Sequence, residues 1–205
     1  VTTPEGLPTP APTPEEQADF RAVLLPNTAL YDGTAAEQLQ AAGANTAVFD
    51  MKADDGTLGY ISELALAAQA EVSAADPALN AAIQLLNDGD ITTVARVSCF
   101  RDNTVPYYRN SLALHTSGGN WRDGGGSRWL SPASAEARQY AADVCRELAG
   151  LGFDEILLDN WAFPAGGEGI LADNTYPAAD GRTAVLEGFL DQVEEALSGY
   201  SEVRV

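Results

Sequence analysis

The sequence predicts an α/β fold, the N-terminal part of a (β/α)8 TIM-type barrel with about four to five strand–helix units. Short apolar segments alternate with amphipathic segments, which is typical of parallel strands joined by helices. The predicted strands are nearly continuous apolar runs, as in strands buried on both faces. Polar side chains at Asp50, Arg101 and Asp159 follow the ends of successive strands. The active face of a barrel lies at those ends.

An open doubly wound sheet is the alternative α/β architecture. Such a sheet would concentrate its site at one topological switch point instead of at the ends of several strands. The first predicted strand lacks the Gly-x-Gly-x-x-Gly sequence, and no Gly-x-x-x-x-Gly-Lys-Ser/Thr sequence occurs. The barrel is therefore favoured, and nucleotide-binding folds have little support.

The first half of the chain is predicted to form two strands and two helices. A weak strand at Thr28–Tyr31 is followed by a helix from about Thr34 to Ala42, which Gly43 ends. Thr46–Asp50 is the second strand. Apolar residues at helical spacing predict a helix over Pro77–Asn87, with the Asn-Asp-Gly turn as its end.

The second half continues the alternation, and its third loop is long for a compact domain. Loops of that length are usually functional or disordered. The third helix opens at Ser131-Pro132, since proline is well tolerated in the first turn. The remaining elements, in order, are a strand at Ile91–Phe100, the loop Arg101–Ser131, the helix to about Leu151, a strand at Glu155–Asp159, a helix over about Gly181–Ser198 and the start of a fifth strand at Glu202–Val205.

The sequence divides into a linker and one domain. Residues 1–18 are expected to be a Pro-rich linker, and residues 19–205 a (β/α) barrel domain. Five prolines within the first 14 residues favour an extended stalk, as in secreted or cell-surface bacterial proteins. A plain disordered tail is the alternative. A complete barrel needs eight strand–helix units. We therefore expect a barrel that is incomplete at its C-terminus. Either the sequence is a fragment, or a second polypeptide completes the barrel, or the chain is a half barrel that pairs with a second copy.

The chain is strongly acidic, with 30 Asp and Glu residues against 11 Lys and Arg, a formal net charge of -19 and a pI near 4.1. Such a charge repels phosphate backbones and anionic lipid headgroups, so nucleic acid and membrane-surface partners are not expected. No apolar stretch is long enough to span a bilayer. Neutral sugars, cations and basic partners remain compatible with this charge. The alternative explanation of the acidic surface is that it only keeps the protein soluble.

Few residues can carry metal or thiol chemistry. Cys99 and Cys145 match no metal motif and are expected to be free, buried thiols. His115 is the only histidine, so nucleophile–His triads and His-based metal sites are excluded. The Asp54-Asp55-Gly56 segment lacks EF-hand spacing, and a turn is favoured over a calcium site. We predict no metal ion and no cofactor.

Five segments carry the motifs of the second, third and fourth strands and of the third loop: Val48–Gly56 with Tyr60, Ala95–Asp102, Gly119–Trp121, Trp129–Pro132 and Gly152–Pro164. In this order they resemble a family of bacterial secreted proteins with a glycosyl-hydrolase-like TIM-barrel domain. The resemblance covers about residues 30–164 and implies a TIM-type barrel and the hydrolysis of glycans. After the fourth strand the family commonly has Asp-Tyr and then Arg-Phe-Pro, whereas this chain has Asp159-Asn160-Trp161-Ala162-Phe163-Pro164.

The candidate catalytic residues are Asp159, Asp50 and Arg96. Glycoside hydrolysis uses two carboxyl groups, so Asp159 could be the nucleophile or the general acid. Ordering of the loop after the strand is the alternative role. An arginine beside Asp50 or Asp159 would keep the carboxylate ionised, which suits a nucleophile and not a proton donor. An internal salt bridge is the alternative for Arg96.

The candidate substrate contacts are Lys52, Asp102, Trp121, Trp129 and Trp161. Lys52 shares the alternation of Asp50, so both are expected to face the barrel mouth, where the lysine can donate to a sugar hydroxyl. A structural ion pair is the competing interpretation. Asp102 and Arg101, which lie just beyond the third strand, are weaker candidates. Indole rings stack on the apolar faces of sugars, although aromatic residues also anchor loops.

The sequence therefore predicts a glycoside hydrolase that acts on a poly- or oligosaccharide through carboxylates at the C-terminal ends of barrel strands. The alternative is a non-catalytic glycan-binding or cell-wall-associated scaffold module. In that module the tryptophans would bind sugar and the acidic residues would hold the loops.

Overall fold

The computed structural model describes residues 20–205, so the predicted linker at 1–18 lies outside the described residues. Four parallel strands form one sheet in the order β1-β2-β3-β6. A parallel bridge between Glu155 and Arg204 adds the predicted start of a fifth strand beside β6. The strands are β1 (Ala22–Leu24), β2 (Thr46–Lys52), β3 (Thr92–Ser98) and β6 (Glu155–Asp159). The predicted parallel α/β arrangement is confirmed.

The predicted helices are present, with shifted ends. Gly43 ends α1 in the left-handed conformation, at φ 62°. The third predicted helix starts at Ala135 and not at Ser131-Pro132, because Ser134 caps it by accepting from the Ala137 amide at 3.3 Å. The helices are α1 (Ala35–Ala42), α2 (Ala65–Gln69), α3 (Leu79–Asn87), α4 (Val105–Tyr108), α5 (Ala135–Gly150) and α6 (Ala179–Leu197), with 3-10 turns η1 (Asn27–Leu30) and η2 (Asn110–Leu112).

The predicted first strand is wrong. The segment Thr28–Tyr31 falls largely in η1, and the first strand is β1, which pairs in parallel with Thr46–Val48. Ala29 and Leu30 are buried in the core, so their apolar character reflects packing of a turn. A run of four residues does not distinguish a strand from a single helical turn by its pattern alone.

The sheet has one covered and one open face. Phe49, Ala95 and Ile156 are at most 1% exposed on the face that the helices cover, and α5 contacts both β3 and β6. Alternate residues point the other way. On that side Leu24 is 61% and Leu157 is 44% exposed. In a barrel this open face is the inner wall.

A β-bulge in β2 interrupts the alternation. Asp50 pairs with Arg96, whereas Lys52 pairs with Val97, so two steps along β2 match one step along β3. The extra residue turns Lys52 to the helix-covered face, where it is fully buried. The prediction that Lys52 faces the barrel mouth together with Asp50 is therefore wrong.

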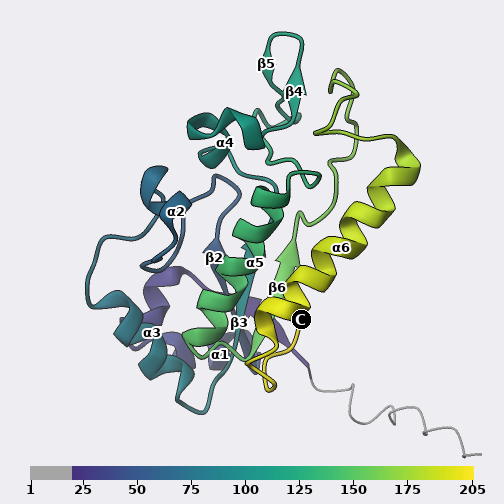
Figure 1. Cartoon of the computed structure of the whole chain (residues 1–205). Coiled ribbons are helices and arrows are strands. Elements are labelled where there is room, and N and C mark those ends of the chain that lie inside the picture. Colours follow the sequence, from purple (N-terminus) through teal and green to yellow (C-terminus); the bar gives the residue numbers. More distant parts are fainter. Residues whose placement is uncertain (1–19) are drawn as a thin grey trace, which may run out of the picture.

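The long loop after β3 is folded and lies beyond the carboxyl ends of the strands. It carries α4, η2 and the small hairpin of β4 (His115–Thr116) and β5 (Gly119–Asn120) (Figure 1). Its base is fixed to the sheet because the Leu130 amide donates to the Phe100 carbonyl at 2.8 Å. This loop and the loop after β2 form the rim of the candidate site.

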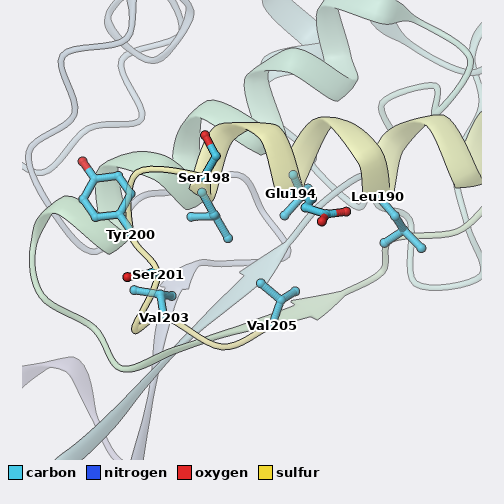
Figure 2. A pocket seen from close by; sticks show the side chains of 9 residues that line it. Leu190, Glu194, Ser198, Tyr200, Ser201, Val203 and Val205 are labelled. Carbon is cyan, nitrogen blue, oxygen red and sulfur yellow. The ribbon is translucent and has the colours of Figure 1, made fainter. Parts of the chain in front are cut away.

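A cavity of about 490 Å³ lies on the outer side of the sheet, between α6 and the C-terminal segment. Figure 2 shows Leu190 and Glu194 on α6 above Val203 and Val205. Its lining is mostly apolar, and none of the candidate catalytic residues belongs to it.

Two further expectations concern the cysteines and membrane-spanning helices. Cys99 and Cys145 are both buried and free, as predicted. Within residues 20–205, no helix is long and apolar enough to cross a membrane.

Candidate active site

Arg96 lies at the centre of a carboxylate cluster on the open face of the sheet. Its Nη1 donates to Asp50 Oδ1 at 2.7 Å, and its Nη2 to Asp54 Oδ1 at 2.6 Å. Asp159 Oδ2 lies 2.9 Å from Nε and 2.7 Å from Nη2. The register explains the meeting, because Arg96 pairs with Asp50 on β2, and β6 places Asp159 beside Ser98. The structure thus brings together all three predicted catalytic residues.

A second arginine extends this cluster into the rim. Arg101 forms an ion pair with Asp54 through Nη1, and its Nε donates to Asp123 Oδ2 at 2.7 Å. Asp123 Oδ2 also accepts from the indole of Trp129 at 3.0 Å. The loop after β3 is therefore tied through Arg101 to the same aspartate that Arg96 holds.

The ion pairs fix the protonation of these groups. Burial alone would raise the pKa of Asp54, but hydrogen bonds from Arg96 and Arg101 lower it below its ordinary value. Burial likewise opposes ionisation of Asp123, yet bonds from Trp129, Arg101 and the Ser127 amide lower its pKa to about 2. Asp54 and Asp123 are thus carboxylates at neutral pH, which does not suit a proton donor.

The carboxylates of the cluster also shift the pKa of Arg96. Burial lowers the pKa of Arg96, but its hydrogen bonds to Asp54, Asp50 and Asp159 outweigh that effect and raise the pKa above its usual range. Arg96 is therefore a permanent cation, with 17% of its side chain exposed. Asp159 has the most open side chain of its three partners, at 47%.

Asn160, which directly follows β6, is hydrogen-bonded to the cluster. Its side-chain amide donates to Asp54 Oδ1 at 3.2 Å and to Ser98 Oγ at 2.9 Å. Its φ is 48°, a left-handed conformation that asparagine tolerates better than most residues do. The sequence identified Asn160 only as a difference from the family pattern, and the structure gives it a bridging role.

Lys52 and Asp102 lie beneath the site and not in it. The Lys52 ammonium donates to Asp102 Oδ2 and to the Ser98 carbonyl, both at 2.8 Å, and both side chains are fully buried. Asp102 Oδ1 accepts from the Thr104 and Val105 amides at the start of α4. The predicted direct contacts with substrate do not agree with this burial, and the competing interpretation as a structural ion pair does.

The three tryptophans have different surroundings. Trp121 and Trp129 are 6% and 8% exposed, and their indoles donate to the Glu168 carbonyl and to Asp123. Both therefore anchor loops. Trp161, directly after Asn160, is 37% exposed. Of the predicted sugar-stacking residues, Trp161 is the one whose ring is open to solvent.

The Asp54–Gly56 segment is a turn, as expected. Asp55 accepts from the amide and hydroxyl of Thr57, at 2.9 and 2.6 Å, whereas Asp54 turns back to the arginines. In the part of the chain that the structure describes, no group of three or more His, Cys, Asp or Glu side chains is arranged to hold a metal ion.

Residues 33–204 match the family described as "Putative glycosyl hydrolase domain". The chain belongs to this family. The resemblance noted in the sequence is thereby confirmed, and the match extends beyond residue 164. No curated protein matches the sequence significantly.

Solved structures place this glycosyl hydrolase domain among barrel proteins. A hypothetical protein from Ruminiclostridium thermocellum is 24% identical, with a TM-score of 0.74 over 89% of this chain and 95% of that chain. Alpha-L-fucosidase isoenzyme 2 from Paenibacillus thiaminolyticus is 14% identical, with a TM-score of 0.61 over 91% of this chain and 32% of that one. The chitobiase of Flavobacterium johnsoniae is 13% identical, with a TM-score of 0.59 and coverage of 90% and 30%.

These likenesses show the fold. The domain corresponds to part of a TIM-type barrel, because its described residues form a parallel sheet of four strands and a complete barrel has eight. It spans about a third of the two hydrolase chains. The residues that sequence reasoning missed are Asp54 and Asn160, and it rated Arg101 too low. Asp54 reaches Arg96 only because the turn after β2 folds back toward β3. No spacing in the sequence signals that contact.

Proposed function

We propose that this domain is a glycoside hydrolase that acts on a poly- or oligosaccharide, with Asp159 as its central carboxylate. The observation that carries the proposal is the cluster of Asp50, Asp54 and Asp159 around Arg96. It lies on the inner wall of the barrel, at the carboxyl ends of adjacent strands. Active sites of barrel enzymes lie at these strand ends.

The geometry favours a separate role for each residue of the cluster. Arg96 orients Asp159 through Nε and Nη2, while a large part of the Asp159 carboxylate stays open to solvent. An oriented carboxylate can attack the anomeric carbon, or stabilise the positive charge that develops there, as the bond to the glycosidic oxygen breaks. The leaving oxygen takes its proton from a second carboxyl group in its acid form, a role to which no residue of the cluster is assigned. Asp50 and Asp54 hold the other edge of the guanidinium, so they fix its plane. Trp161 supplies an exposed ring for stacking against a sugar.

The proposal is tested by measuring reducing-end release from a panel of oligosaccharides with the parent chain and with Asp159→Asn. We expect the substitution to lower turnover by about 10²- to 10⁴-fold, because it removes the charge and keeps the shape of the side chain. Asp191→Asn is the matched control. Asp191 is exposed on α6, on the outer side of the sheet, and should leave turnover unchanged.

The rival function, a non-catalytic glycan-binding module, makes the opposite prediction. It would give binding of an oligosaccharide by the parent chain with no turnover, and Asp159→Asn would bind equally well. That result would exclude the hydrolase.

A further inference from the structure

Two arginines face each other across the loop after β3. Arg122 and Arg128 form an antiparallel bridge, with Asp123 and the turn at Gly124–Gly126 between them. Both reach Asn103, because the Arg122 Nη1 lies 3.3 Å and the Arg128 Nη1 3.0 Å from its Oδ1. One amide oxygen thus holds two like charges close together.

Neither arginine has a carboxylate partner among residues 20–205. In the same part of the chain, Arg96, Arg101, Arg109, Arg146 and Arg204 each form an ion pair, as does Lys52. In a chain with 30 acidic residues, a pair of adjacent cations with no counter-ion is unexpected. Their mutual repulsion contributes, after burial, to a lowered pKa of Arg128. Such an arrangement is stabilised when an anion binds between the two charges.

The donors that face solvent suit an anion with two oxygens. Each guanidinium bonds to the protein through Nη1, to Asn103 and, for Arg122, also to the Gly126 carbonyl at 2.6 Å. Nε and Nη2 of both residues have no hydrogen-bond acceptor within the described residues. These two nitrogens form the fork that binds carboxylate or sulfate in a bidentate way.

An aromatic surface lies beside this pair. The Arg128 guanidinium lies 5.0 Å from the centre of the Tyr107 ring, and Tyr107 is 67% exposed. Tyr108, 50% exposed, meets Tyr107 edge to face at 5.7 Å. Exposed rings of this kind stack on sugar faces. The patch thus combines an anion-binding fork with a stacking surface.

The same hairpin is tied to the carboxylate cluster. Asp123, next to Arg122, binds Arg101, which pairs with Asp54. Thr104, next to Asn103, donates to the Asp55 carbonyl at 2.7 Å and so joins this part of the rim to the loop after β2. The arginine pair therefore lies on the rim of the proposed active site.

We propose that Arg122 and Arg128 form a subsite for the anionic group of an acidic sugar, a carboxylate or a sulfate. This inference rests on the proposed action on glycans and narrows the substrate to a charged one. The net charge of the chain does not prevent such binding, because charges beyond about 8 Å are largely screened at physiological ionic strength.

The test is calorimetric titration of the full chain with three probes: an oligogalacturonide, the same oligomer with its carboxyl groups reduced, and a sulfated galactan oligomer. Arg122→Gln and Arg128→Gln should each weaken binding of an acidic probe by about tenfold or more. Binding of the reduced oligomer should not change. Arg128→Lys, which keeps the charge without the fork, should weaken acidic binding by less. Preference for one acidic probe identifies the anionic group.

Arg182→Gln is the matched control, because Arg182 contacts the Phe163 and Tyr176 rings and has no carboxylate partner within the described residues. It removes one charge and should leave all affinities unchanged. Equal affinity for acidic and reduced probes, or equal effects of the three glutamine variants, would overturn the subsite. Turnover that is lost in Asp159→Asn but unchanged in Arg122→Gln and Arg128→Gln would reject the subsite and keep the hydrolase function. Binding of the acidic sugar that needs both arginines, with no turnover by the parent chain, would keep the subsite and reject the hydrolase function.

Discussion

Two cations on neighbouring strands show how burial decides the role of a charged residue. Arg96 shares three carboxylates that are 36% to 47% exposed, so water and substrate still reach the cluster. Lys52 has one carboxylate, Asp102, and neither is exposed. A buried pair contributes little net stability, but removal of one partner leaves an uncompensated charge. The first cluster can therefore take part in chemistry, whereas the second can only support the fold.

At the scale of single residues we predict that Lys52→Met destabilises the chain by about 3–5 kcal/mol. The methionine fills the space of the lysine but leaves the buried Asp102 carboxylate without a counter-ion. Adding Asp102→Asn should recover part of the loss, because the amide keeps an acceptor for the Thr104 and Val105 amides. Urea denaturation of the two single variants and the double variant measures both effects.

Arg146→Ala is the comparison for an exposed ion pair. Arg146 is 46% exposed and pairs with Asp143 three residues earlier on α5, so its loss should cost less than about 1 kcal/mol. Equal costs for Arg146→Ala and Lys52→Met would contradict the assignment of Lys52 to a buried structural pair.

Among the elements, the strands were predictable and their irregularities were not. Apolar runs located β2, β3 and β6, and the ends of these strands identified Asp50 and Asp159 correctly as neighbours. The bulge in β2 has no signal in the local pattern, so alternation placed Lys52 on the wrong face. Asp54 was assigned to a turn, which is right for the backbone but misses its side chain. Contacts between loops depend on tertiary structure, which a single sequence does not encode in its spacing.

The turn after β2 provides a test at this scale. Gly56 has φ +94°, and a Cβ there would overlap the Asp102 carboxylate, 2.7 Å from its Cγ. Gly33 has a similar φ of +79°, with nothing within 4 Å of a Cβ. Both alanine variants bear the backbone strain, and Gly56→Ala also displaces a buried ion pair. We expect Gly56→Ala to cost about 1–3 kcal/mol more than Gly33→Ala in thermal unfolding. A similar melting temperature for both variants would show that Asp102 moves freely.

The molecule as a whole is an arc of parallel strands with its inner wall open. The sequence predicted this partial barrel because alternation of strands and helices is visible along the chain, and the structural likeness to barrel hydrolases agrees with it. The inner wall bears apolar side chains beside the carboxylates, with Leu24 at 61% and Leu157 at 44% exposure. Exposed apolar faces of this kind are usually covered by a partner.

We therefore predict that a second copy covers the inner wall and that light scattering of the chain shows concentration-dependent dimers. Leu24→Lys should shift the equilibrium to monomer, because burial of a lysine ammonium against the partner is costly. Leu85→Lys is the control, since Leu85 is 77% exposed on α3, away from the inner wall. A monomer at all concentrations, or equal effects of both substitutions, would refute the dimer.

The bulge in β2 also bears on how such a site changes in evolution. A strand presents its side chains in a two-residue frame, and the bulge shifts that frame between Asp50 and Lys52. Deletion of Met51 would remove the bulge and place the lysine directly after Asp50, still opposite Val97 and on the helix-covered face. The bulge can therefore be gained or lost by a single-codon insertion or deletion, while Asp50 stays on the inner wall and the lysine stays in the core.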